Sequence, residues 1–117
     1  EQPINDAEEI TANLLTANPD KDSVTAIFAA WDEPAIGAAK ALQEAGREEV
    51  IVTGVDGNEQ AVEMIKDGTN LKATVKQNFE GMADIVCEQM DKYFAGEEIE
   101  KGEMYAPAEL ITQENAQ

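Results

Sequence analysis

Short apolar runs alternate along the chain with segments whose apolar positions recur every three or four residues. The runs Val24–Ala30 and Val50–Val55 lack polar alternation, which is typical of strands buried on both faces of a parallel sheet. A third run, Ala73–Gln77, is weaker because it is short and contains Lys76. Since a helical pattern follows each run, we expect βαβ units with right-handed crossovers and an α/β fold.

Capping and stop signals place the first two helices. Asn5, with Glu8 three residues later, predicts a capping box for a helix that ends near Ala17. Asp32 is expected to cap the helix after the first run. Gly46 is expected to end that helix in the left-handed conformation.

The second half of the chain predicts two more helices and an extended segment. A short helix should end at Gly68, and a longer one should begin at Asn78 and end near Ala95. The apolar face of the longer helix consists of Phe79, Met82, Val86, Met90, Tyr93 and Phe94. Cys87 lies beside that face, which favours a buried, inert thiol. Met104–Ile111 contains a proline, which predicts an edge strand or a crossing segment, and the polar tail Thr112–Gln117 should be frayed.

Composition excludes several classes of function. With 117 residues the chain fits one domain, and its net charge of −17 argues against contact with nucleic acid or anionic lipid. Histidine is absent and Cys87 is the single cysteine, which excludes the usual zinc sites, the common catalytic triads and an internal disulfide. No motif predicts a metal or a cofactor. The sequence starts at Glu1 without a signal peptide, as expected of a mature or truncated product.

Polar and aromatic residues follow the three predicted strands. Because ligands of parallel sheets bind outside the carboxyl ends of the strands, these residues should share one rim. They are Trp31 and Asp32 after the first strand, Asp56 after the second, and Gln77 and Asn78 after the third. A carboxylate, an amide and an indole ring together suit a polyhydroxylated ligand. Each also has a plainer interpretation, since Asp32 and Asp56 are common helix-cap and turn residues and a lone tryptophan is often core.

Three segments in order resemble one family. Phe28–Ala38 is similar to the pattern F-A-x-x-D-x-x-A-x-G-A, and Val50–Asn58 to V-x-V-x-G-x-D-G-x. Ile65–Gln77 resembles I-x-x-G followed by A-T-x-x-Q. These are motifs of the type I periplasmic sugar-binding proteins, the ribose-binding and lactose-repressor-like superfamily. The resemblance covers nearly the whole chain.

The resemblance implies a Rossmann-like lobe of a two-lobed protein that closes on a sugar about a hinge. Residues 1–77 would form the βα units of the C-terminal lobe and residues 78–103 a helix that packs on an N-terminal lobe absent here. Residues 104–117 would form a returning strand and tail. The ligand positions of the family carry over onto Trp31, Asp56 and Gln77. At the Trp31 position the ribose binders have Asn instead, so the expected ligand is a sugar or sugar-like polyol in general.

The implied function is substrate binding for an ABC importer, whose membrane permease would be the partner. The implied location is the bacterial periplasm or cell surface, in a secreted protein or lipoprotein. An alternative is the effector-binding domain of a lactose-repressor-type transcription regulator. An enzyme would have to pair Asp32 with Asp56 as acid and base, and a receiver domain would need more strand–helix units. As an isolated fragment, the chain should either dock its long helix on its own sheet or exchange it with a second copy.

Overall fold

The computed structural model describes residues 2–116, which form two compact units. The first unit contains the residues up to Lys76 and those from Leu110 onward, and the second contains Gln77–Glu109. The first holds nearly all the predicted βα pattern, and the second holds the long helix.

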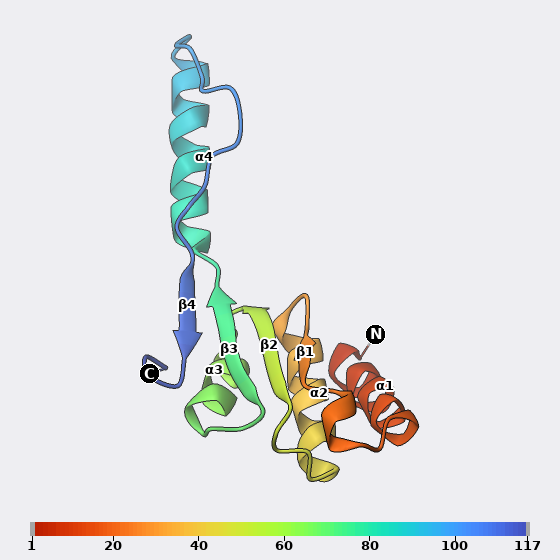
Figure 1. Ribbon diagram of the computed structural model, residues 1–117. Coiled ribbons are helices and arrows are strands. Elements are labelled where there is room, and N and C mark those ends of the chain that lie inside the picture. Colours follow the sequence, from red (N-terminus) through yellow and green to blue (C-terminus); the bar gives the residue numbers. More distant parts are fainter. Residues whose placement is uncertain (1, 117) are drawn as a thin grey trace. The chain divides into compact units, whose positions relative to one another are not determined.

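The sheet confirms the α/β class. Its strands β1 (Ala26–Phe28), β2 (Ile51–Asp56) and β3 (Leu71–Lys76) pair in parallel, and β4 (Glu109–Thr112) lies at the edge beside β3. Figure 1 shows β4 running opposite to β3, so the predicted edge strand is confirmed, although it begins later than Met104.

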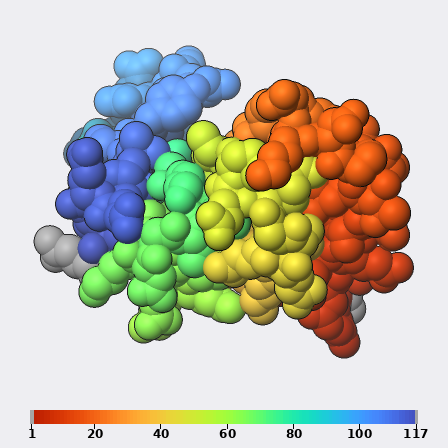
Figure 2. All heavy atoms as spheres, turned by 60° about the horizontal axis from the view of Figure 1, so that its bottom comes forward, coloured from red at the N-terminus to blue at the C-terminus, as the bar shows by residue number. Residues whose placement is uncertain are grey.

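Three α-helices belong to the first unit: α1 (Pro3–Ala17), α2 (Asp32–Glu44) and α3 (Glu59–Lys66), with a short 3-10 helix, η1 (Lys21–Ser23), after α1. Helix α1 packs closely on α2 because Gly37 has no side chain: a Cβ there would lie 3.0 Å from the Glu8 nitrogen and nearer still to the Ile4 carbonyl. In Figure 2 the red atoms of α1 accordingly lie directly against the orange and yellow atoms of the segments that follow.

The core lies between α2, α3 and one face of the sheet. Its fully buried large apolar side chains are Ile36, Leu42, Ile65, Leu71, Val50 and Val52. The expectation of strands buried on both faces is wrong for β1 and β2, because Phe28 is 74% and Ile51 46% exposed. Both side chains lie on the face of the sheet opposite the core. Ile51 and Thr53 flank buried Val52 and so project from that opposite face, and Phe28 shares it because Phe28 pairs with Thr53.

The helix ends agree with the sequence in part. Gly46 ends α2 with a φ of 66°, as predicted, and the Asn58 side chain caps α3 by accepting from the Ala61 nitrogen at 2.8 Å. The capping box at Asn5 is wrong, because α1 begins at Pro3 and Asn5 instead donates to the Gln2 side chain at 2.5 Å. Proline at the first helical position has a suitable φ and lacks an N–H to satisfy, so it starts the helix earlier.

The tail is ordered by local hydrogen bonds rather than frayed over the described residues. The Asn115 side chain accepts from the Thr112 nitrogen at 2.7 Å and donates to the Leu110 carbonyl at 2.9 Å. Ala116 packs partly against the core. The prediction for Thr112–Gln117 is therefore wrong up to Ala116, and Gln117 lies outside the described residues.

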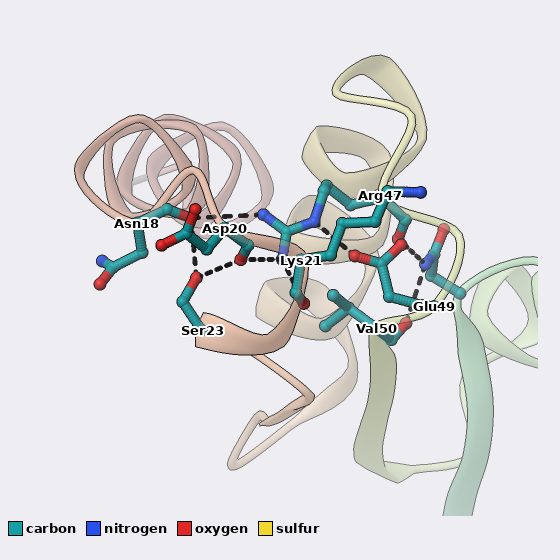
Figure 3. A network of polar contacts seen from close by, with 8 residues as sticks. Asn18, Asp20, Lys21, Ser23, Arg47, Glu49 and Val50 are labelled. Carbon is teal, nitrogen blue, oxygen red and sulfur yellow. Dashed lines mark hydrogen bonds and ion pairs between the residues drawn. The ribbon is translucent and has the colours of Figure 1, made fainter.

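Arg47 ties the segment after α1 to the turn after α2 (Figure 3). The residue is only 7% exposed, and its guanidinium donates to the carbonyls of Asn18 (3.3 Å), Asp20 (3.3 Å) and Lys21 (3.0 Å). Its Nε also donates to a Glu49 carboxylate oxygen at 2.6 Å, and this hydrogen bond lowers the pKa of Glu49. No local sequence pattern predicts these hydrogen bonds of Arg47.

The second unit contains α4 (Phe79–Phe94), which begins and ends as predicted. The Asn78 side chain caps it by accepting from the Gly81 nitrogen at 2.9 Å, and Gly96 follows its end with a φ of 74°. None of the residues of α4 is buried. Cys87 is exposed, so the expectation of a buried thiol is wrong: the large apolar side chains of α4 are themselves more than a third exposed. No helix among residues 2–116 has the length and apolar character to cross a membrane.

Candidate functional site

The carboxyl ends of β1, β2 and β3 point to the same edge of the sheet because the three strands are parallel. A helix starts soon after each end, which leaves free backbone N–H groups nearby. This edge is where open α/β sheets bind their ligands. The parallel topology places the three strand ends at one edge, as the sequence predicts, and the use of this edge as a ligand site stays a prediction.

Trp31 is the residue that precedes α2, where it has an extended backbone and no capping hydrogen bond. It is 44% exposed and so is not a core residue. The indole lines a hollow together with residues from the start of α1 and α2, namely Pro3, Asp6, Ala7, Ile10 and Pro34. Trp31 is thus accessible at the surface three residues after the end of β1, and its role as a ligand residue stays a prediction.

Asp56 is the last residue of β2 and is half-buried. Its φ of 121° is the only positive value among the non-glycine residues from 2 to 116. A non-glycine residue in such a conformation costs on the order of 1–3 kcal/mol, and such residues cluster at functional sites. Gly57 follows with a φ of 75° and lies so close to Lys76 that a Cβ would come 2.6 Å from the Lys76 Cβ.

Gln77 directly follows β3, whose last residue, Lys76, pairs in register with Asp56. It is the first residue of the second unit. Its role as a ligand residue stays a prediction.

Asp32 has a different role from the one expected. The structure places it at the first helical position of α2 rather than at the cap, and it is fully buried. One carboxyl oxygen accepts from the Thr74 hydroxyl at 2.7 Å and the other from the Asn58 nitrogen at 2.7 Å. Both partners are distant in sequence, so only the tertiary fold brings them together. Asp32 therefore has no exposed surface, and both of its carboxyl oxygens are occupied by hydrogen bonds within the fold.

Gly54 is the residue that makes room for Asp32. A Cβ on Gly54 would lie 3.1 Å from the Ala35 Cβ and closer still to an Asp32 carboxyl oxygen. The small residue inside an otherwise β-branched strand was a signal, readable from the sequence, that another group approaches the backbone there. No group of three His, Cys, Asp or Glu residues within 2–116 is arranged to hold a metal ion.

Trp31 and Asp56 carry group types that suit sugar-like ligands. A carboxylate can accept hydrogen bonds from neighbouring hydroxyl groups, and an indole can cover the C–H face of a ring. Two helix N-termini, those of α2 and α3, supply further N–H groups at the same edge.

Comparison with known proteins identifies the family of this chain. The sequence profile of the periplasmic binding protein domain matches residues 2–98. The ribose import binding protein of Salmonella typhimurium is 42% identical over 91 residues, a match that covers 78% of this chain and 29% of that protein. The chain thus spans less than a third of the length of this relative.

Solved structures show the same fold. An ABC sugar transporter subunit from Rhodobacter sphaeroides has a TM-score of 0.87 and 38% identity, over 96% of this chain and 40% of that one. A solute-binding protein from Agrobacterium vitis with bound allitol has a TM-score of 0.88 and 30% identity, over 97% of this chain and 39% of that one. The sheet edge, the family profile and these relatives together show that this chain belongs to the periplasmic binding protein domain family.

Proposed function

We propose that the protein containing this chain is the substrate-binding component of an ABC importer and that it binds a sugar or sugar-like polyol. The observation that carries the proposal is Asp56, a half-buried carboxylate held at a strand end in a strained backbone conformation. The ribose import relative and the allitol-bound neighbour support the same class of ligand. The partner would be the membrane permease, and the location the periplasm or the bacterial cell surface.

In this proposal the protein binds its ligand and does not transform it. The enzyme alternative needs a second carboxyl group facing the substrate. Asp32, the candidate for that role, is fully buried and bonded through both oxygens. The regulator alternative shares the fold, but the ribose import relative, whose match covers 78% of this chain, is an import protein.

The exposed apolar face of α4 fits the same proposal. Six large apolar side chains of α4 are more than a third exposed: Phe79, Met82, Val86, Met90, Tyr93 and Phe94. We infer that a second lobe covers them, and that the chain crosses between lobes near Gln77–Asn78 and near Tyr105–Pro107. In an isolated fragment a second copy would take the place of that lobe. The end of the first unit at Lys76 supports the first crossing.

A thermal-shift screen of the full protein tests the ligand class. We expect D-ribose, D-allose, allitol or myo-inositol to raise the melting temperature, because a ligand that binds only the folded state stabilises it by mass action. An amino acid such as L-leucine serves as the chemically different control. A shift with L-leucine and none with any sugar or polyol would contradict the proposal.

Two variants then locate the site. Asp56→Asn keeps the shape of the side chain and tolerates a positive φ, so any loss reflects the charge. Hydrogen bonds to charged groups contribute about 1.5–3 kcal/mol, so binding should weaken by roughly ten- to a hundredfold in calorimetry. Trp31 is the single tryptophan, so ligand should change the fluorescence, and Trp31→Ala should reduce affinity more than stability. Unchanged affinity in Asp56→Asn would refute the site.

A further inference from the structure

A buried hydrogen-bond network holds the backbone of the two residues that follow Asp56. The Gly57 nitrogen donates to the Thr74 hydroxyl oxygen at 3.3 Å, and that hydroxyl donates to one oxygen of Asp32 at 2.7 Å. The Asn58 nitrogen donates to the other Asp32 oxygen at 2.7 Å. The two residues that follow Asp56 are therefore both anchored by their backbone nitrogens.

The side chains of this network are buried. Asp32 is 0% and Thr74 1% exposed, so neither side chain can exchange its partner for water. Burying a carboxyl group costs several kcal/mol unless its hydrogen bonds are satisfied. Both oxygens are satisfied here, and this requirement selects one position for the Asp56–Asn58 turn.

The backbone of Asp56 needs such support. On one side β2 holds it in register with Lys76, and on the other side Gly57 and Asn58 are anchored as described. A strained φ persists only where the surroundings determine it on both sides. Removing the anchors should let the φ of 121° relax and turn the carboxylate away from the rim.

We propose that Thr74 and Asp32 are positioning residues that act through Asp56: they fix the direction of the carboxylate that binds the ligand. The inference rests on the proposed function, because it takes Asp56 as the ligand carboxylate. It adds two residues that never touch the ligand yet set its affinity.

The test compares Thr74→Val with Thr74→Ser in the full protein. Valine has the shape of threonine but neither accepts from Gly57 nor donates to Asp32, whereas serine keeps both functions. With whichever of D-ribose, D-allose, allitol and myo-inositol the wild type binds, we expect Thr74→Val to weaken binding roughly tenfold in calorimetry, and Thr74→Ser to stay within about twofold. Asp32→Asn is the second variant: the amide oxygen can still accept from the Asn58 nitrogen, but the amide nitrogen cannot accept from the Thr74 hydroxyl, so we expect binding to weaken as in Thr74→Val.

A double-mutant cycle separates positioning from general destabilisation. If Thr74 acts through Asp56, then Thr74→Val should weaken binding far less in an Asp56→Asn background than in the wild type. Hydrogen exchange of the Gly57 amide reports independently whether the network has opened.

The outcomes distinguish the two proposals. Fast exchange at Gly57 with unchanged affinity in Thr74→Val overturns this inference, as does an equal loss in both backgrounds. Wild-type affinity in Asp56→Asn overturns the proposed function and this inference with it. Weak binding in Asp56→Asn with an unaffected Thr74→Val overturns the inference alone.

Discussion

Replacing Arg47 with methionine tests how the first unit is held together. Methionine retains much of the apolar stem of arginine but none of its donors, so the carbonyls of Asn18, Asp20 and Lys21 lose their partner. The more exposed Glu49 carboxylate loses its hydrogen bond from Nε as well, but water can replace that partner. Because Arg47 is 7% exposed, water replaces the guanidinium poorly. The change therefore isolates the hydrogen bonds from the packing of the side chain.

The three distances set the size of the effect. Hydrogen bonds from a charged donor contribute about 1.5–3 kcal/mol each at good geometry. The bonds here measure 3.0–3.3 Å, which is long for a charged donor, so each belongs at or below the lower end of that range. Allowing for partial hydration of the released carbonyls, we expect a loss of about 2–4 kcal/mol in the free energy of unfolding.

Urea unfolding followed by circular dichroism measures this loss. A control, Lys66→Met, removes the same charge from an exposed position of α3 and should change stability by less than about 0.5 kcal/mol. Arg47→Lys should recover only part of the loss, because an ammonium group cannot span three carbonyls as a planar fork does. If Arg47→Met is as stable as Lys66→Met, the hydrogen bonds of Arg47 do not stabilise the fold.

Two further predictions concern the core and acid stability. Gly54→Ala should lower the free energy of unfolding, measured in urea titrations, by about 1–3 kcal/mol, because the added Cβ overpacks against Ala35 and Asp32. A urea midpoint equal to that of the wild type would contradict the close approach of Asp32 to the Gly54 backbone. The pKa of Glu49 is lowered from 4.5 by Arg47, so this carboxylate stabilises the fold above its ordinary pKa and ceases to do so as the pH falls through the lower, folded value. Melting temperatures of Glu49→Gln and wild type should therefore differ at pH 7 and converge in acid, and a difference that persists at low pH would count against the ion pair.

Local signals in the sequence determined most of the element order. The strand–helix alternation, the left-handed Gly46 and the Asn78 cap each depend on residues within one turn of one another, so the chain reveals them without knowledge of the fold. The same holds for the placement of Trp31 between β1 and α2 and of Asp56 at the end of β2, since a strand end and the next helix start are neighbours in sequence.

Tertiary structure decided what the buried polar groups do and which faces are covered. Asp32 has the sequence signature of a cap, yet it bonds Asn58 and Thr74, and Arg47 reaches back to Asn18. No local pattern encodes these partners, because they are many residues away along the chain and meet only when the strands pair. Likewise, the apolar run Val24–Ala30 has the pattern of a strand buried on both faces, but whether a second layer covers it depends on elements outside the run. Periodicity specifies a residue's own element; burial and polar partners depend on what packs against that element.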